Sequence, residues 1–289
     1  MDTGKHGGKG LAQWIGLLAC LLFFSTAYGK EVLQVSVSHH QGTAQAFDGI
    51  DGLDIAQWET ELVLPLALRS ASAGLWLQGL QFSENRLTLS GAAEASRRLY
   101  RISLPLEYHP KKRGRWQYYW HLEPAYYTDE TLIDEKRFLF EYQFISRYGK
   151  RNSVNWVAGI RQDSRFGSEQ LYPVFGLESR PNKKWLHHWV FPDFYSEVNF
   201  KRHHFAQAFM RPSGGYWPFT QADGSSAAVG VTNWQFGVSL RKKTRSPFFL
   251  RLEVGTKVMG QASIAGSDGD LGSAYFFMLS LETDISANN

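Results

Sequence analysis

Residues 98–126 read RLYRISLPLEYHPKKRGRWQYYWHLEPAY, and apolar and polar side chains alternate on both sides of the central PKKRG. Before that turn, one face carries Tyr100, Ile102, Leu104, Leu106 and Tyr108, and the other carries Arg101, Ser103, Glu107 and His109. After the turn, Trp116, Tyr118, Trp120, Leu122 and Tyr126 oppose Gln117, Tyr119, His121 and Glu123. Because successive side chains of a strand point to opposite faces, a period of two predicts a hairpin with one apolar and one ionisable face.

The same alternation recurs from about residue 32 to the last predicted strand. Its apolar members include Phe138, Phe140, Tyr142, Phe144, Val154, Trp156, Ile160, Phe248, Leu250, Leu252, Val254, Tyr275, Phe277, Leu279 and Leu281. Ionisable residues take the opposite face in each of these segments. The sequence therefore predicts an all-β protein.

Aromatic residues are unusually abundant for a chain that is polar on average. Phe, Tyr and Trp make up 15% of the residues, while the mean hydropathy is −0.32. In a soluble β-sandwich we expect aliphatic residues to predominate in the dry core between the sheets. In a membrane barrel the aromatic face meets lipid and the ionisable face meets a wet lumen. We therefore expect an antiparallel transmembrane β-barrel, with a secreted or periplasmic soluble β-domain as the alternative.

The N-terminal segment has the layout of a secretory signal. Lys5 and Lys9 precede an apolar run over 11–24, and small residues stand at Ala27 and Gly29. This pattern predicts a signal peptide at 1–29 and a barrel domain at 30–289. A retained membrane anchor and lipidation at Cys20 are the alternatives. Cys20 is the only cysteine, so cleavage at 29 leaves a chain without a thiol.

The connections predict how the strands are ordered. Short turns are expected near 70–73, 111–115, 149–153, 182–184, 201–203 and 242–247, and longer loops near 41–55, 83–97, 127–136, 163–170, 214–227 and 260–273. With 33–37 as the first strand, this alternation gives about 14 strands, or 12, with both termini periplasmic. Pro65, Pro105 and Pro124 fall inside predicted strands, so bulges or strand ends must accommodate them.

Residues 171–185, LYPVFGLESRPNKKW, are followed by Phe191-Pro192. This stretch resembles a hairpin of an uncharacterised bacterial outer-membrane β-barrel family, Y-P-x-x-G-L-x-x-x-P-x-x-x-W followed by F-P. The resemblance implies a barrel in the outer membrane of a Gram-negative bacterium. It implies no activity.

The expected function is a porin-like, solute-binding or structural barrel whose mixed-charge lumen selects what enters. The lumen candidates are Arg101, Glu107, His121, Glu123, Glu141, Arg161, Arg251, Glu253 and Lys257. Expected partners are outer-membrane lipid and lipopolysaccharide, the barrel-assembly machinery and a small solute. Loss of Lys5, Lys9 and Asp2 with the signal lowers the formal charge from +4 to +3, a balance too mild to indicate nucleic-acid binding.

The sequence predicts no catalytic, cofactor or metal residues. Three histidine pairs, 39–40, 187–188 and 203–204, invite a metal interpretation, but adjacent strand residues can turn only one ring inward. Asp268-Gly269-Asp270 lacks the pattern of a calcium-binding loop. The rival function is a lipid-modifying barrel enzyme using His121 with Glu123, or His187 near Ser196.

Overall fold

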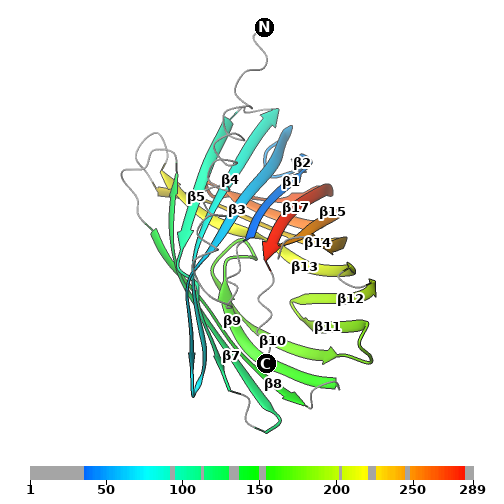
Figure 1. Ribbon diagram of the computed structural model, residues 1–289. Coiled ribbons are helices and arrows are strands. Elements are labelled where there is room, and N and C mark those ends of the chain that lie inside the picture. The colour runs from blue at the N-terminus through cyan, green and yellow to red at the C-terminus, as the bar shows by residue number, and fades with distance from the viewer. Residues whose placement is uncertain are drawn as a thin grey trace.

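A computed structural model describes residues 36–91, 95–111, 114–129, 137–149, 154–201, 204–220, 226–244 and 248–283 (Figure 1). The predicted signal peptide, and residues 33–35 of the predicted first strand, lie outside these ranges. The described chain is a closed antiparallel β-barrel of 14 strands, at the upper end of the predicted 12–14. None of its described residues forms a helix long and apolar enough to cross a membrane.

Three barrel strands are interrupted, so 17 segments make up the wall. They are β1 (Ser36–Gly42), β2 (Gln45–Phe47), β3 (Leu53–Ala71), β4 (Gly74–Gly91), β5 (Ala95–Ser103), β6 (Leu106–Pro110), β7 (Trp116–Asp129), β8 (Arg137–Gly149), β9 (Val154–Asp163), β10 (Gln170–Ser179), β11 (Trp185–Phe191), β12 (Asp193–Lys201), β13 (His204–Thr220), β14 (Ser226–Lys243), β15 (Phe248–Ile264), β16 (Ser267–Leu271) and β17 (Ala274–Thr283). The barrel closes where β1 pairs with both β17 and β3. The pairs β1/β2, β5/β6 and β16/β17 each continue one strand of the wall.

The three prolines lie at irregularities of the sheet. The register of β3 against β4 shifts between Pro65 and Ala67. Pro105 falls in the break between β5 and β6, and Pro124 of β7 lies opposite that break. Leu104 N donates to Pro124 O at 3.1 Å there. The missing N–H groups therefore fall where the hydrogen-bond ladder is already interrupted.

The two ends of the barrel differ in their connections. We call the end that holds Ser36 and Thr283 the terminus-side end, and the opposite one the far end. The strands at the terminus-side end are connected where short turns were predicted. At the far end, the long loops predicted at 41–55, 83–97, 214–227 and 260–273 are wrong, because strand structure occupies most of these stretches. The region 73–97 holds one strand, β4, and the start of β5.

Glycine explains part of that error. Gly214 and Gly215 fall within a predicted loop, yet both lie inside β13 and pair with β14. A Cβ on Gly214 would collide with the backbone carbonyl of Val231, so only glycine allows this close approach.

Apolar side chains face outward and ionised ones face inward. Phe138 is 74% exposed and Trp156 is 64% exposed, whereas Glu253 is 0% and Lys257 is 1% exposed. This is the inversion of a soluble protein that the alternation predicted, and it argues against the soluble sandwich.

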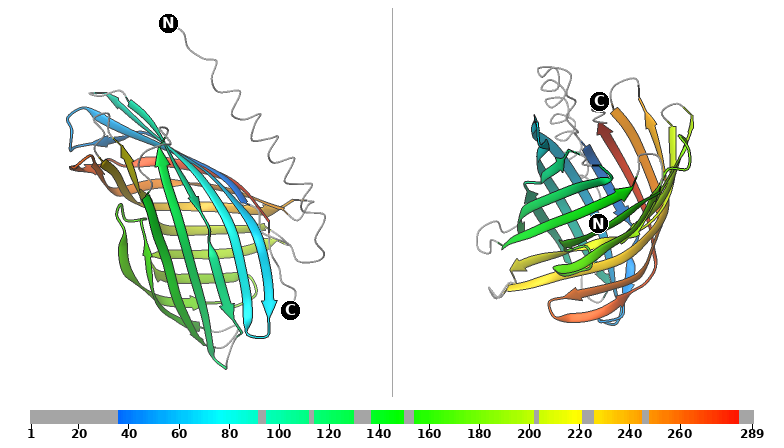
Figure 2. Two further views of the ribbon diagram at one scale, coloured as in Figure 1. Left: turned by 90° about the vertical axis from the view of Figure 1, so that its left-hand side faces the viewer. Right: turned by 90° about the horizontal axis from the view of Figure 1, so that it is seen from below.

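The far end also contains an apolar cluster inside the barrel, which the sequence analysis did not predict. Its members include Phe47, Leu53, Ile55, Leu87, Leu99, Tyr127, Leu139, Trp217, Val229, Val231 and Leu271, contributed by strands on opposite walls. Strands β7 and β13 contact each other there although they are not sheet neighbours. In Figure 2 the strands β3–β5 cross strands β13–β15 in this region. The far half is therefore flattened around a dry core.

The turn over 164–169 covers the part of the wall on the far-end side of the short β11–β12 hairpin. Gly167 lies close to Gly230 of β14. A Cβ on Gly230 would collide with the carbonyl oxygen of Gly167. The Phe166 ring lies 6.3 Å from the Trp234 ring and 5.1 Å from the Tyr172 ring, both in edge contact. The turn thus joins β9–β10 to β14 across the hairpin.

Candidate functional site

A cavity of about 640 Å³ occupies the lumen between the apolar cluster and the terminus-side end. At the terminus-side end its lining includes Ser36 and Glu282, which are register partners in β1 and β17. At the far end its lining includes Tyr127 and Trp217, which also belong to the apolar cluster. The cavity therefore runs from the terminus-side end and stops against the dry core.

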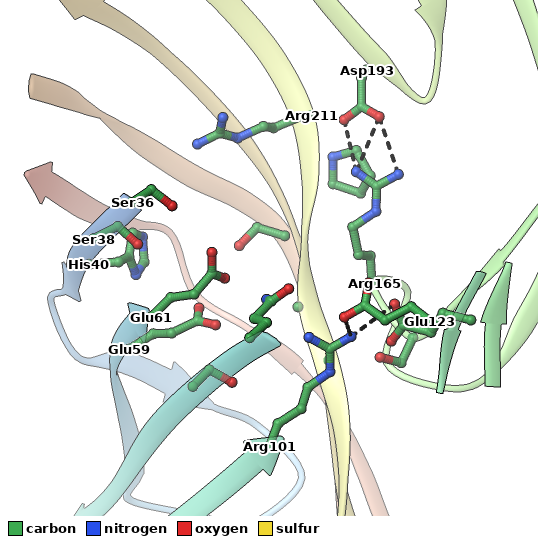
Figure 3. A pocket seen from close by; sticks show the side chains of 18 of the residues that line it. Ser36, Ser38, His40, Glu59, Glu61, Arg101, Glu123, Arg165, Asp193 and Arg211 are labelled. Atoms are coloured by element: carbon green, nitrogen blue, oxygen red, sulfur yellow. Dashed lines mark hydrogen bonds and ion pairs between the residues drawn. The ribbon is translucent and has the colours of Figure 1, made fainter. Parts of the chain in front are cut away.

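One group of charges centres on Arg101 of β5 (Figure 3). Its guanidinium lies 2.6 Å from a Glu123 oxygen and 3.2 Å from a Glu141 oxygen. It also donates to the Tyr127 hydroxyl at 2.9 Å, and Ser103 donates to Glu123 at 2.6 Å. Strands β5, β7 and β8 are adjacent, so alternation brings these inward side chains to one level. Each ion is paired and hydrogen-bonded, which offsets the cost of removing it from bulk water.

His121 extends this group toward the terminus-side end. Its Nε2 lies 2.9 Å from Glu123 Oε2, and its Nδ1 lies 3.8 Å from Glu107 Oε1. Glu107 also contacts His109 Nε2 at 3.2 Å. Glu107 does not line the cavity, whereas His121 does.

A second group lies beside the first, around Asp163 at the end of β9, the sheet neighbour of β8. Arg161 contacts Asp163 at 2.5 Å, and Arg165 contacts it at 2.9 Å. Arg165 also binds Asp193 at 2.9 Å, and the Tyr172 hydroxyl donates to Asp163 at 2.7 Å. Burial disfavours the Arg165 cation, but the carboxylates of Asp193 and Asp163 outweigh it and raise the pKa of Arg165 above its ordinary value.

A third group lies on β13, β15 and β17. Arg211 donates to Glu253 at 2.5 Å, although β14 lies between their strands. Arg251 lies 3.7 Å from Glu253 and 3.3 Å from Glu282. Lys257 is buried behind the cavity beside Gly42 and does not line it.

The structure thus brings six predicted lumen residues to the cavity surface: Arg101, His121, Glu123, Glu141, Arg161 and Arg251. Glu107, Glu253 and Lys257 lie outside that lining, although Glu107 and Glu253 contact residues within it. Five further charged residues of the lining were not among the predicted lumen residues: Glu59, Glu61, Arg165, Asp193 and Arg211. Glu59 and Glu61 alternate with Trp58 and Leu62 in β3, so the same period of two would have found them.

Figure 3 shows Glu59 and Glu61 together on one wall, near Ser36, Ser38 and His40. No described cation forms an ion pair with either carboxylate, whereas Glu123, Asp163 and Glu253 are each paired with an arginine. His40 Nε2 lies 3.2 Å from the Gln235 amide nitrogen, and His40 Nδ1 is buried without a hydrogen-bond partner. Of these groups, the carboxylates of Glu59 and Glu61 line the cavity and are available to a molecule in it.

Two of the three histidine pairs divide between the two faces, as the alternation predicted, and His203 of the third pair lies outside the described residues. His40 faces the cavity while His39 contacts Thr60 and Trp58 on the outer face. His188 contacts Glu178, while His187 stacks on Trp185. Among the residues that the structure describes, no three His, Cys, Asp or Glu side chains are grouped to hold a metal ion.

The outward pair His187 and Ser196 was a candidate for lipid chemistry. Register places them opposite each other, and His187 Nδ1 lies 2.9 Å from Ser196 Oγ. Trp189 Nε1 also donates to this hydroxyl at 3.3 Å. No described carboxylate hydrogen-bonds to His187, so the pair lacks the third group that orients a catalytic base.

The known proteins that are similar to this chain are solved β-barrel structures of low sequence identity. No protein-family model and no curated protein matches this sequence, so the family resemblance of the 171–192 hairpin stays a prediction. Among solved structures, the Pseudomonas putida toluene transporter TodX is 7% identical, with a TM-score of 0.47 over 89% of this chain and 90% of that one.

The KdgM porin is 8% identical, with a TM-score of 0.38 over 86% of this chain and 98% of that one. The β-domain of the Bordetella autotransporter BrkA is 10% identical, with a TM-score of 0.37 over 87% and 99%. These values assign neither a family nor a ligand to this chain.

Proposed function

We propose that this chain is an outer-membrane β-barrel that binds a small polar solute in a lumen closed at its far end. The observation that carries the proposal is the cavity of about 640 Å³, which reaches the terminus-side end and stops at Tyr127 and Trp217. An open porin would need a continuous wet path, and a packed apolar cluster interrupts one here. Passage of a solute would require that cluster to separate.

The outer membrane is the location that the faces of the barrel favour. An exposed band of Trp, Phe and Leu suits acyl chains, and the paired ions inside suit a water-filled lumen. Barrels of this kind hold both termini in the periplasm, so the cavity would be reached from the periplasmic side.

Cysteine accessibility tests location, orientation and closure together. The only native cysteine is Cys20, within the predicted signal peptide. Ser38→Cys places a thiol in the cavity, and Ser267→Cys places one at the exposed far end. A membrane-impermeant thiol reagent added to intact cells should label Ser267→Cys alone, and it should label Ser38→Cys only after the periplasm is opened.

Labelling of Ser38→Cys in intact cells would show a lumen open to the outside, and the closed-lumen proposal would be wrong. Failure to label Ser267→Cys in intact cells would contradict the proposed location or orientation. Planar bilayers give an independent measurement, in which the inserted wild-type protein should show no steady ohmic conductance.

A further inference from the structure

The terminus-side end of the barrel carries a collar of exposed cationic side chains. Its described members are Arg69, Lys111, Arg115, Arg180, Lys183, Lys184, Lys201 and Lys242, which lie in the turns or at the strand ends there. We call these eight residues the basic collar. Within the described parts of the turns at this end, no Asp or Glu occurs. No described carboxylate forms an ion pair with any of the eight.

Aromatic rings on the outer face of the barrel lie next to several residues of the basic collar. Arg69 is the register partner of Trp76, whose ring stacks on Tyr108 at 4.3 Å. Arg115 precedes Trp116 and donates to the Tyr148 hydroxyl at 3.5 Å.

The arrangement repeats on the other side of the barrel. Lys184 precedes Trp185, and Lys201 follows Phe200; both rings are exposed. The amphipathic rings of Trp and Tyr, as at Trp76, Tyr108, Trp116 and Trp185, settle at the level of lipid headgroups. The cations beside and beyond them therefore reach the plane of the phosphates.

Other cations at this end point inward and do not belong to the collar. Arg241 lies over the rings of Phe205 and Phe249, and Lys243 lies over Phe249. Arg147 pairs with Glu178. These side chains face the mouth of the lumen, whereas the collar is free to contact the membrane surface.

The far end has the opposite charge. Its described turns carry Asp48, Asp51 and Glu169, and the short strand β16 carries Asp268 and Asp270. The exposed arginines near that end, Arg86 and Arg98, are register partners on β4 and β5. Judged by its described residues, the barrel is therefore polarised along its axis, and only the terminus-side end is complementary to an anionic surface.

We infer that the basic collar binds the phosphate groups of anionic phospholipids in the leaflet around the terminus-side end. Basic residues at a membrane surface attract anionic lipids, and several act together within one Debye length. The inference rests on the proposed membrane location, but it is independent of the cavity and its solute.

Spin-labelled lipids test this inference. The full mature chain is reconstituted in phosphatidylcholine vesicles that contain spin-labelled phosphatidylglycerol or spin-labelled phosphatidylcholine. Electron paramagnetic resonance then measures the motionally restricted fraction of each lipid. At low salt the wild type should restrict phosphatidylglycerol at least about twofold more strongly than phosphatidylcholine, and molar salt should remove the difference.

Two variants locate the effect. Lys183→Gln/Lys184→Gln should lower the preference, and addition of Arg69→Gln and Arg115→Gln should bring it close to one. The matched control, Arg86→Gln/Arg98→Gln, removes two exposed cations near the far end and should keep the wild-type preference. Vesicle co-flotation and heat-modifiable gel mobility report insertion and folding separately for each protein.

An inserted wild-type barrel without a phosphatidylglycerol preference would overturn the inference. Loss of the preference in the Arg86/Arg98 control, with the collar variants unaffected, would also overturn it by placing the contact at the far end. Failure of the wild type to insert would instead contradict the proposed membrane location.

Discussion

Arg165 Nη1 lies 2.9 Å from Asp193 Oδ1, which joins the turn after β9 to the first residue of β12. Arg165 also holds Asp163, a carboxylate that is only 2% exposed. Because β10 and β11 lie between these strands, the arginine fastens the far end of the barrel across the β11–β12 hairpin.

We expect Arg165→Met to destabilise the barrel by roughly 3 kcal/mol, since buried Asp163 loses one of its two arginine partners and Asp193 keeps only a 4.0 Å contact with Arg161. Urea unfolding followed by tryptophan fluorescence measures this. Arg86→Gln, which removes an exposed arginine bonded to Ser96, should cost less than about 1 kcal/mol. Equal stabilities of the two variants would contradict the fastening role.

Gly230→Ala should also loosen the far end. Its Cβ would overlap the carbonyl oxygen of Gly167, so the 164–169 turn must move away from β14. The expected cost is roughly 1–3 kcal/mol, read as a lower unfolding midpoint. Gly272→Ala is the matched control, because its nearest neighbours would lie at 3.5 Å or more, and it should leave the midpoint unchanged.

Trp217→Ala should open the lumen. The ring is 7% exposed and belongs both to the cavity lining and to the apolar cluster that ends it. We expect single-channel events in planar bilayers that the wild type lacks. Trp217→Leu keeps an apolar side chain and should stay silent, and so should Trp120→Ala on the outer face. A silent Trp217→Ala barrel with native gel mobility would show that the ring does not close the lumen.

Val238→Arg tests which face meets lipid. Val238 is 53% exposed on the outer face of β14, and an arginine within the apolar band costs roughly 2–4 kcal/mol in a membrane barrel. Gln143→Arg adds the same charge to the cavity lining, where water and carboxylates receive it. Folding into vesicles should therefore be impaired for Val238→Arg alone. The reverse order would show that lipid does not cover the aromatic face.

Ser196→Ala addresses the lipid-modifying alternative. The hydroxyl contacts both His187 and Trp189, and neither contact supplies the carboxylate of a hydrolytic triad. Mass spectrometry of phospholipid and lipopolysaccharide incubated with the wild type should show no lysolipid or fatty acid. Product that appears with the wild type and disappears with Ser196→Ala would establish the enzyme instead.

Much of the site was predictable because it depends on a local rule. Arg101, Glu123 and Glu141 alternate with apolar residues of the opposite face, and period two turns such ionisable residues inward. Their partners were harder to predict. The contact of Arg211 with Glu253 crosses a whole strand, and that of Arg165 with Asp193 depends on a turn that folds across a hairpin.

The sequence by itself determined the strands, their two faces and the turns at the terminus-side end, because alternation and turn chemistry act over a few residues. Only the tertiary structure decided that the far end is flattened and dry. Phe47, Leu99 and Trp217 come from distant parts of the chain, and each is an inward apolar residue in a wall strand that also carries inward polar residues. Whether such residues face water or one another depends on how far apart the opposite walls stand, and that separation is a property of the closed barrel, not of any one strand.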